Sequence, residues 1–269
     1  MAPFSESPTR SRLYQEHLVL PARRGTQIPQ YTLRSVLGIW AAAALPMAAL
    51  AWLVAPSMAA GMDGPSALPR ALLASLTVGL IWQFVLVLVL VHREQGTLRW
   101  QVVKDALWLH RPRRPDGSPM RWAWLVLIPL LVAFAATDRL PTPPMPASRD
   151  MGRFLESDAG QSFLSDNWTW LAVIVVLGIF NTVLGEELLF RGLLLPRMSG
   201  AFGRWDWAAN GVLFAVYHLH MPWVIATALL DAFVLSYPSK RYRSAWIGIA
   251  VHSAQTVAIS AAVLALVLS

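Results

Sequence analysis

Residues 167–184 read NWTWLAVIVVLGIFNTVL, and residues 185–198 continue as GEELLFRGLLLPRM. The first stretch is an unbroken apolar run that is long enough to span a bilayer as a helix. Glu186, Glu187 and Arg191 follow it directly, although a charged side chain at the centre of a membrane helix costs about 2.5–3.5 kcal/mol on insertion scales. Charges kept in such a setting predict a polar site inside the membrane.

The composition of the whole chain agrees with a membrane protein. Of 269 residues, 56% are hydrophobic and only 14% are charged, whereas a soluble domain carries roughly 25% charged residues. The absence of cysteine excludes disulfides, thiolate metal sites and a cysteine nucleophile. The net charge of +7 is attributed to basic cytoplasmic loops, so the expected partner is the lipid bilayer and no nucleic acid is expected.

The hydrophobic pattern predicts an all-α, polytopic helical bundle of about seven (six to eight) transmembrane helices. We expect a cytoplasmic N-terminal segment at 1–35, three accessory helices within 36–137, an extracytoplasmic loop at 138–167 and a four-helix core at 168–269, which holds nearly every polar group inside the membrane. The seven apolar segments have approximate limits of 36–55, 70–91, 122–137, 168–195, 205–219, 222–237 and 244–268.

The distribution of Lys and Arg predicts the orientation, because cytoplasmic connections carry an excess of basic residues. The connections at 1–35 and 92–121 are rich in arginine, whereas residues 56–69 contain neither Lys nor Arg. We therefore expect a multi-pass protein of the plasma (inner) membrane with a cytoplasmic N-terminus. Its site is expected to open toward the cytoplasmic side.

Polar groups inside the expected core come from several segments. At a rise of 1.5 Å per residue, the Glu186/Glu187 pair, His218 and His252 reach comparable depths near the middle of the membrane. Such residues predict a shared site, since intramembrane ionisable groups are usually functional. Asp231 is expected to have a structural role, and His220 is expected at a turn without a chemical role.

The spacing of the charges predicts different roles for the two glutamates. Glu187 and Arg191 are four residues apart, so they share one helix face and can form an ion pair. Glu186 lies about 100° around the helix and can face a cavity, where burial suits a carboxylate to act as a general base on water. His218 and His252 could orient that water, donate to an oxyanion or bind a metal.

Three motifs resemble those of the CPBP family, which contains type II CAAX prenyl proteases and bacteriocin-processing or immunity relatives, also called ABI proteins. They are EELLFR at 186–191, FAVYH at 214–218 and AVHSAQT at 250–256, and the RSAW stretch at 243–246 is similar to the segment that leads into the last core helix. The resemblance covers about 170–265 and leaves the first three segments outside it.

The resemblance implies an intramembrane peptidase of glutamic or metallo type. Glu186 would activate water with support from Glu187 and Arg191, His218 would position the water or substrate, and His252 would help to form the oxyanion hole. Phe214 and Thr256 would serve as oxyanion or substrate-positioning residues. Thr256 departs from the family pattern, because asparagine is usual four residues after the last histidine, and this puts the activity in doubt.

The need for a metal is left open by the residues alone. The sequence lacks HExxH, and we favour a mechanism without a required metal. A divalent ion such as zinc would have Glu186, His218 and His252 as its ligands on chemical type.

Three functions agree with these residues. The first is an endopeptidase that cleaves membrane-associated proteins or peptides, by CAAX-like, leader or C-terminal tail processing. The second is a non-enzymatic bacteriocin-immunity or regulatory membrane protein of the same fold. The third is a transporter whose ionisable groups relay protons or ions. The sequence does not reveal the natural substrate, a role for prenylation or the oligomeric state.

Overall fold

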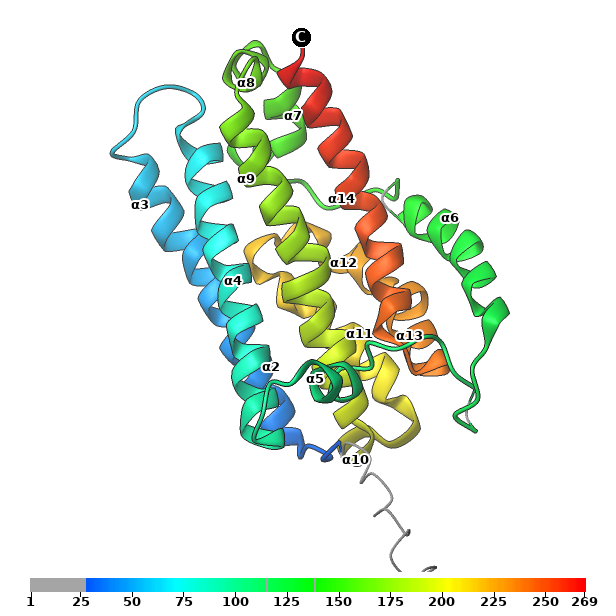
Figure 1. The fold of residues 1–269 in the computed structure, drawn as a ribbon. Helices are drawn as coiled ribbons and strands as arrows, with labels where there is room; N and C mark the ends of the chain where they lie inside the picture. Colours follow the sequence, from blue (N-terminus) through cyan, green and yellow to red (C-terminus); the bar gives the residue numbers. More distant parts are fainter. Residues whose placement is uncertain (1–27, 115, 138) are drawn as a thin grey trace, which may run out of the picture.

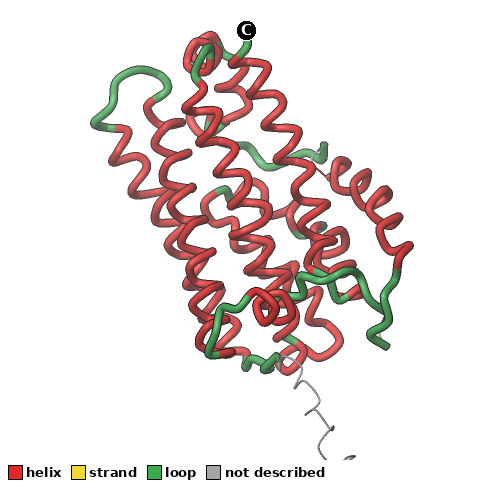
Figure 2. The backbone as a smooth tube through the Cα atoms, in the orientation of Figure 1, coloured by secondary structure: helices red, strands yellow, loops and turns green. Residues whose placement is uncertain are grey.

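The computed structural model describes residues 28–114, 116–137 and 139–269. Most of the expected cytoplasmic segment at 1–35 therefore lies outside the described residues. The described part is helical and contains no β-strand, apart from one isolated bridge between Arg113 and Pro119 (Figure 2). The predicted all-α class is confirmed.

Four helices are long and apolar enough to cross a membrane, within the described residues: Leu33–Ala59, Ala67–Gln95, Trp168–Arg197 and Ala245–Val267. The apolar helix at Trp122–Thr137 is shorter. The two segments expected at 205–219 and 222–237 are broken into short helices and turns. Seven spanning helices are thus not confirmed, because the described residues contain four helices of spanning length and several shorter ones packed among them.

The elements follow one another around these spans (Figure 1). The first half contains α2 (Leu33–Ala49), a π-helical turn (Leu50–Val54), α3 (Ala55–Ala59), α4 (Ala67–Gln95), α5 (Trp100–Ala106), a 3-10 turn (Arg121–Val126) and α6 (Leu127–Thr137). The connection after α6 contains a 3-10 turn (Ala147–Arg149), α7 (Met151–Glu156) and α8 (Asp158–Leu164).

The second half begins with one continuous span that changes its helical type along its length. It is built from α9 (Trp168–Ile179), two π-helical turns (Phe180–Gly185 and Leu188–Leu194) and a 3-10 turn (Leu195–Arg197). The elements after it are α10 (Ser199–Phe202), α11 (Asp206–Tyr217), 3-10 turns (Gly203–Trp205, His218–His220 and Pro222–Val224), α12 (Ile225–Ala228), a π-helical turn (Ala232–Ser236), α13 (Tyr237–Tyr242) and α14 (Ala245–Val267).

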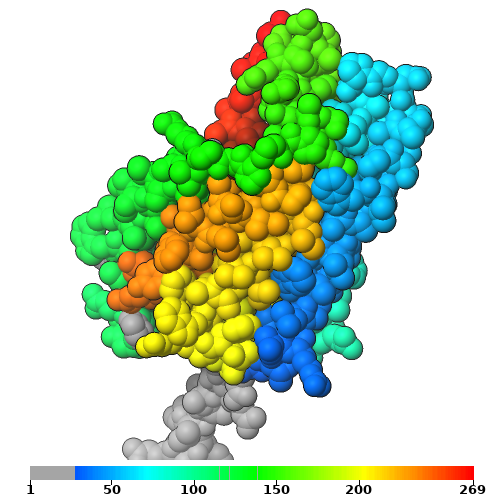
Figure 3. Space-filling view, turned by 180° about the vertical axis from the view of Figure 1, so that it is seen from behind, coloured from blue at the N-terminus to red at the C-terminus, as the bar shows by residue number. Residues whose placement is uncertain are grey.

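The connections gather at two ends of the molecule. In Figure 1 the α3–α4 loop, α7, α8 and the C-terminus lie at one end, whereas the start of α2, α5 and α10 lie at the other. From behind, the chain after α6 crosses the molecule next to the orange segment near residue 230 (Figure 3). This grouping matches the alternation of basic and non-basic connections in the sequence, and the direction of the bundle in a membrane stays a prediction.

A hydrogen bond joins accessory helices α2 and α4 at a backbone carbonyl that a proline leaves without its helical donor. Pro46 lies inside α2 and has no backbone N–H, so the carbonyl of Ala42 has no donor four residues later. The indole Nε1 of Trp82 on α4 donates to that carbonyl at 2.8 Å. A backbone group that lipid could not satisfy is thereby paired within the protein.

A buried ion pair fixes the end of the third span against the first half. Arg197 is fully buried, and its guanidinium binds both carboxylate oxygens of Glu94 at the end of α4. Its Nη1 also donates to the carbonyls of Ala106 and Leu193, and the Tyr31 hydroxyl bonds to the same carboxylate. This cluster holds the start of α2, the end of α4 and α5 at one end of the bundle.

Close packing between α11 and the 232–236 turn predicts a strong effect of one methyl group. A Cβ at Gly211 would lie 2.1 Å from the Cβ and 2.6 Å from the Cα of Ala232, and backbone must move to relieve that overlap. We expect Gly211→Ala to lower stability by about 1–3 kcal/mol. Thermal unfolding of the detergent-solubilised protein measures this effect.

The matched control is Gly38→Ala in α2, where an added Cβ meets nothing within 4 Å. Because alanine has the better helix propensity, this variant should be neutral or more stable by up to about 1 kcal/mol. Equal melting temperatures for the two variants would contradict the close approach at Gly211.

Candidate active site

The two adjacent glutamates lie between the two π-helical turns of the third span. Both are buried, with 2% of Glu186 and none of Glu187 exposed. A π-helical turn widens the helix locally and is frequent at functional sites. Here the two π-helical turns change the directions of the side chains at 180–194. A regular helical period of 3.6 residues therefore does not describe which face each of these side chains occupies.

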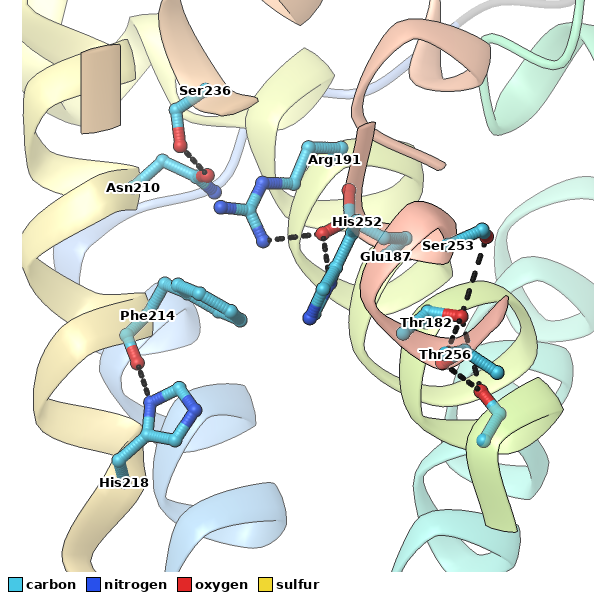
Figure 4. Close-up of polar contacts among 11 residues, drawn as sticks. Thr182, Glu187, Arg191, Asn210, Phe214, His218, Ser236, His252, Ser253 and Thr256 are labelled. Atoms are coloured by element: carbon cyan, nitrogen blue, oxygen red, sulfur yellow. Dashed lines mark hydrogen bonds and ion pairs between the residues drawn. The ribbon is translucent and has the colours of Figure 1, made fainter. Parts of the chain in front are cut away.

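Glu187 is the centre of a buried charge cluster (Figure 4). Its Oε1 accepts from Arg191 Nη1 at 2.8 Å, so the pair predicted from the four-residue spacing is present. The same oxygen accepts from His252 Nδ1 at 3.1 Å. Because a carboxylate offers no proton, Nδ1 must carry the hydrogen, and the orientation of the His252 ring is fixed.

Gly248 allows α14 to approach this cluster. A Cβ at that position would lie 2.4 Å from Glu187 Oε2, 3.1 Å from Ser239 Oγ and 3.3 Å from Arg191 Cγ. His252 lies one helical turn further along α14 and so shares this face. The glycine therefore brings the imidazole within reach of the carboxylate.

Phe214 of α11 separates the charged cluster from His218. The Arg191 guanidinium lies 4.0 Å from the centre of the Phe214 ring, in the position for a cation–π interaction. The rings of His218 and His252 contact Phe214 edge to face, at centroid distances of 4.9 and 6.1 Å. Phe214 thus sets the spacing of the two imidazoles.

His218 ends α11 and uses one nitrogen for the backbone. Its Nδ1 lies 2.9 Å from the carbonyl oxygen of Phe214 (Figure 4). A carbonyl can only accept, so Nδ1 is the protonated nitrogen, and Nε2 of the neutral ring is an acceptor. His218 can therefore hold a water molecule by accepting one of its hydrogens.

A cavity of about 160 Å³, here called the polar cavity, receives these groups. Glu186, His218 and His252 all line it, so the structure brings together three of the residues predicted from separate segments. Its remaining lining is Phe134, Thr137, Asn181, Phe214, Met221, Val224, Thr227, Ala228, Asp231 and Gln255. Glu187 and Arg191 lie behind this lining, in the core.

A second cavity of about 290 Å³, here called the apolar cavity, meets the same carboxylate. Glu186, Asn181 and Met221 line both cavities. Glu186 Oε2 is buried without a hydrogen-bond partner among the described residues. One glutamate is thus paired in the core, and its neighbour lies at the border of two cavities.

Thr256, which was predicted to position the oxyanion or the substrate, does not line the polar cavity. Its hydroxyl donates to Thr182 Oγ1 at 3.2 Å and its methyl group packs against Gly178 of α9. The expected contribution of Thr256 to an oxyanion site is therefore not supported by its position. Two side-chain amides line the cavity instead: that of Gln255, the neighbour of Thr256 on α14, and that of Asn181 on the third span.

Gln83 and Tyr217 are site residues that the sequence analysis did not identify. Both are fully buried, and Gln83 Nε2 donates to the Tyr217 hydroxyl at 2.6 Å. The hydroxyl hydrogen remains available for the Glu186 carboxylate, with which Tyr217 also interacts. The sequence contained one signal for this contact. Gln83 lies inside the apolar helix α4, and a buried side-chain amide requires a hydrogen-bond partner.

His220 and Asp231 lie closer to the site than expected. His220 is buried, stacks on His218 at a centroid distance of 5.5 Å and lines the apolar cavity. Asp231 is buried and lines the polar cavity. The turn at 218–220 is therefore packed inside the protein.

The residues weighed as zinc ligands do not form a metal site in this arrangement. Within the described part of the chain, no group of three or more His, Asp or Glu side chains could hold one ion. His252 and His218 each use Nδ1 for a protein acceptor, which leaves Nε2 of each ring for another partner. No chemical step is assigned to a metal, and the expectation that none is required stays a prediction.

The fold and the buried site define a helical protein of membrane type with a buried carboxylate that lines two cavities between its helices. Residues 167–258, about a third of the chain, match the family model described as type II CAAX prenyl endopeptidase Rce1-like, a family whose members are generally proteases. No curated protein and no solved structure matches the chain significantly. The apolar spans and the family together support a multi-pass membrane protein.

The different surroundings of the two glutamates predict opposite effects on stability. Glu187→Gln leaves Arg191 as a buried charge without its partner and should destabilise the protein by about 3–5 kcal/mol. Glu186→Gln removes a buried carboxylate whose Oε2 has no described partner and should raise the melting temperature. Thermal unfolding of both variants in the same detergent measures the contrast, and an equal loss in both would contradict it.

Proposed function

We propose that this protein is an intramembrane endopeptidase in which Glu186 activates water to hydrolyse peptide bonds of membrane-associated proteins or peptides. The observation that carries the proposal is the position of Glu186, which lines both cavities while Glu187 is neutralised by Arg191 and His252. The match to an endopeptidase family supports the same reaction class.

In the first step, a water molecule held between Glu186 and Nε2 of His218 attacks the carbonyl carbon of the scissile bond. Its proton passes to Glu186 as the new C–O bond forms, which is general base catalysis. The carbonyl π electrons move to the oxygen and give a tetrahedral oxyanion. When the C–N bond breaks, Glu186 returns the proton to the leaving amine, and the carboxyl product and the amine are released.

The developing oxyanion requires hydrogen-bond donors in the polar cavity. The ring of His252 is oriented by Glu187 in the way that a carboxylate orients a catalytic histidine. When both of its nitrogens are protonated, Nε2 donates while Glu187 balances the charge. The side-chain amides of Asn181 and Gln255 are the further donors in the cavity lining, which offsets the absence of asparagine at position 256.

The apolar side chains in the lining of the polar cavity, such as Phe134, Met221 and Val224, indicate substrates with an apolar segment beside the cleaved bond. C-terminal tails, including CAAX-like tails, and peptide leaders satisfy this requirement. From the distribution of basic connections, we infer that such substrates are cleaved on the cytoplasmic side of a plasma (inner) membrane.

Glu186→Gln tests the proposed reaction. The amide cannot take a proton from water, so we expect cleavage to fall by at least roughly 100-fold, the lower part of the range for loss of a general base. The measurement uses purified protein in lipid nanodiscs and quenched fluorescent peptides with an apolar C-terminal tail, in prenylated and unprenylated forms.

Glu156→Gln is the matched control, because Glu156 ends α7 and lies outside the polar cavity. It should cleave the peptides at the rate of the unchanged protein. Cleavage by Glu186→Gln at that rate would disprove the role of Glu186. If the unchanged protein is folded and cleaves none of the peptides, a non-enzymatic immunity or regulatory role would replace the proposal for these substrates.

Tyr217→Phe tests whether the hydroxyl positions the Glu186 carboxylate. Loss of one hydrogen bond to a charged group should reduce kcat by roughly 10-fold or more, since such bonds contribute about 1.5–3 kcal/mol. KM should change little, because the hydroxyl does not line either cavity. Gln83→Leu should reproduce part of the effect, and an unchanged kcat in both variants would exclude the positioning role.

A further inference from the structure

The apolar cavity is a candidate lipid site that lies among the long spans. Its volume of about 290 Å³ is roughly twice that of an engineered apolar cavity of about 150 Å³ that binds benzene. Side chains of α4, α9 and α14 form its walls, and the segment from the 147–149 turn to α8 contributes the end nearest the C-terminus. The lining includes Leu72, Leu73, Leu76, Leu177, Ile259 and Val263.

Arg149 gives this cavity a positive charge at the end formed by the connection. Its Nη2 donates to the carbonyl of Ala51 at 3.1 Å, and its guanidinium lies 3.8 Å from the centre of the Trp52 ring. No carboxylate forms an ion pair with Arg149 within the part of the chain that the structure describes. Arg149 and Glu186 are the two charged residues of the lining. Of the two, only Arg149 can bind an anionic group, because a carboxylate repels it.

The chemistry of the lining favours a hydrocarbon chain over a peptide segment. A peptide backbone brings N–H and C=O groups that each require a partner in an apolar environment. The side chains between Arg149 and Glu186 are almost all aliphatic or aromatic. An alkyl chain needs no such partners, and an anionic group at its head complements Arg149.

We propose that the apolar cavity binds one acyl chain of an anionic membrane lipid, with its headgroup at Arg149 and its chain directed toward Glu186. Basic residues beside membrane helices bind acidic headgroups by the same electrostatic attraction. A chain in this position covers the side of the Glu186 carboxylate that lines the apolar cavity and leaves the polar cavity as its approach for water. The inference concerns binding and does not depend on proteolysis.

The test uses the full chain in nanodiscs that contain a phosphatidylglycerol with a photoactivatable diazirine on its acyl chain. A phosphatidylcholine with the same labelled chain is the neutral comparison, and cross-linked residues are identified by mass spectrometry. We expect labelling of the cavity lining, such as Leu76 or Ile259, to be roughly tenfold stronger with the anionic lipid, which is the factor for one charge-assisted contact.

Two variants test the headgroup and the chain separately. Arg149→Gln should abolish the preference, so that the two lipids label the lining about equally. Arg153→Gln should keep the preference, because Arg153 is exposed and pairs with Asp150. Leu76→Trp should fill the cavity and remove labelling of its lining with both lipids. Val78→Trp on the exposed side of α4 is the control for the added ring.

Each outcome decides the proposal. Equal labelling of the lining by both lipids, or a preference that survives in Arg149→Gln, would overturn the assignment of Arg149. Labelling confined to the outer faces of the helices would overturn the lipid site. Loss of the lipid label on addition of a prenylated peptide would assign the cavity to substrate, provided that size-exclusion profiles and melting temperatures confirm folded variants.

Discussion

The structure depends on the pairing of one buried charge, the Glu187 carboxylate, inside a bundle of apolar helices. Glu187 accepts from Arg191 on its own helix and from His252 on α14, so one carboxylate joins two spans. Removing Arg191 would leave the Glu187 carboxylate as a buried charge without its counter-ion, which costs several kcal/mol in a low-dielectric interior. Gly248, the contact of Arg191 with Phe214 and the wide π-helical turns around residue 187 all allow these groups to meet.

The same cluster explains how two adjacent glutamates acquire different chemistry. Glu187 is enclosed by its partners, whereas Glu186 lines two cavities and interacts with the Tyr217 hydroxyl. Tyr217 is itself held by Gln83 from α4. A carboxylate that is poorly satisfied in the folded protein reduces stability, and active sites commonly combine such a loss with reactivity.

The first half of the chain takes part in the site although the family match begins at residue 167. Gln83 reaches the Tyr217 hydroxyl, and Glu94 holds the end of the third span through Arg197. Leucines of α4 also form one wall of the apolar cavity. The accessory helices therefore support the half that matches the family model and shape the space beside the Glu186 carboxylate.

Composition and the apolar runs were sufficient to predict an all-helical membrane protein, because a bilayer admits few other ways to satisfy a backbone. The four-residue spacing of Glu187 and Arg191 predicted their pair, since both residues lie on one helix. The motifs also indicated Glu186, His218 and His252 as one set. These features depend on local sequence and on the general properties of lipid.

Other features required the tertiary structure. The count of seven spans was not confirmed, because residues 205–237 form short helices that pack inside the bundle, and apolarity alone does not distinguish a buried helix from a spanning one. Thr256 was predicted in the site, yet the packing of α14 against the third span places its hydroxyl against Thr182. The bond from Gln83 to Tyr217 and the apolar cavity could not be predicted, because they depend on contacts between helices far apart in sequence, and such contacts are decided by side-chain packing in three dimensions.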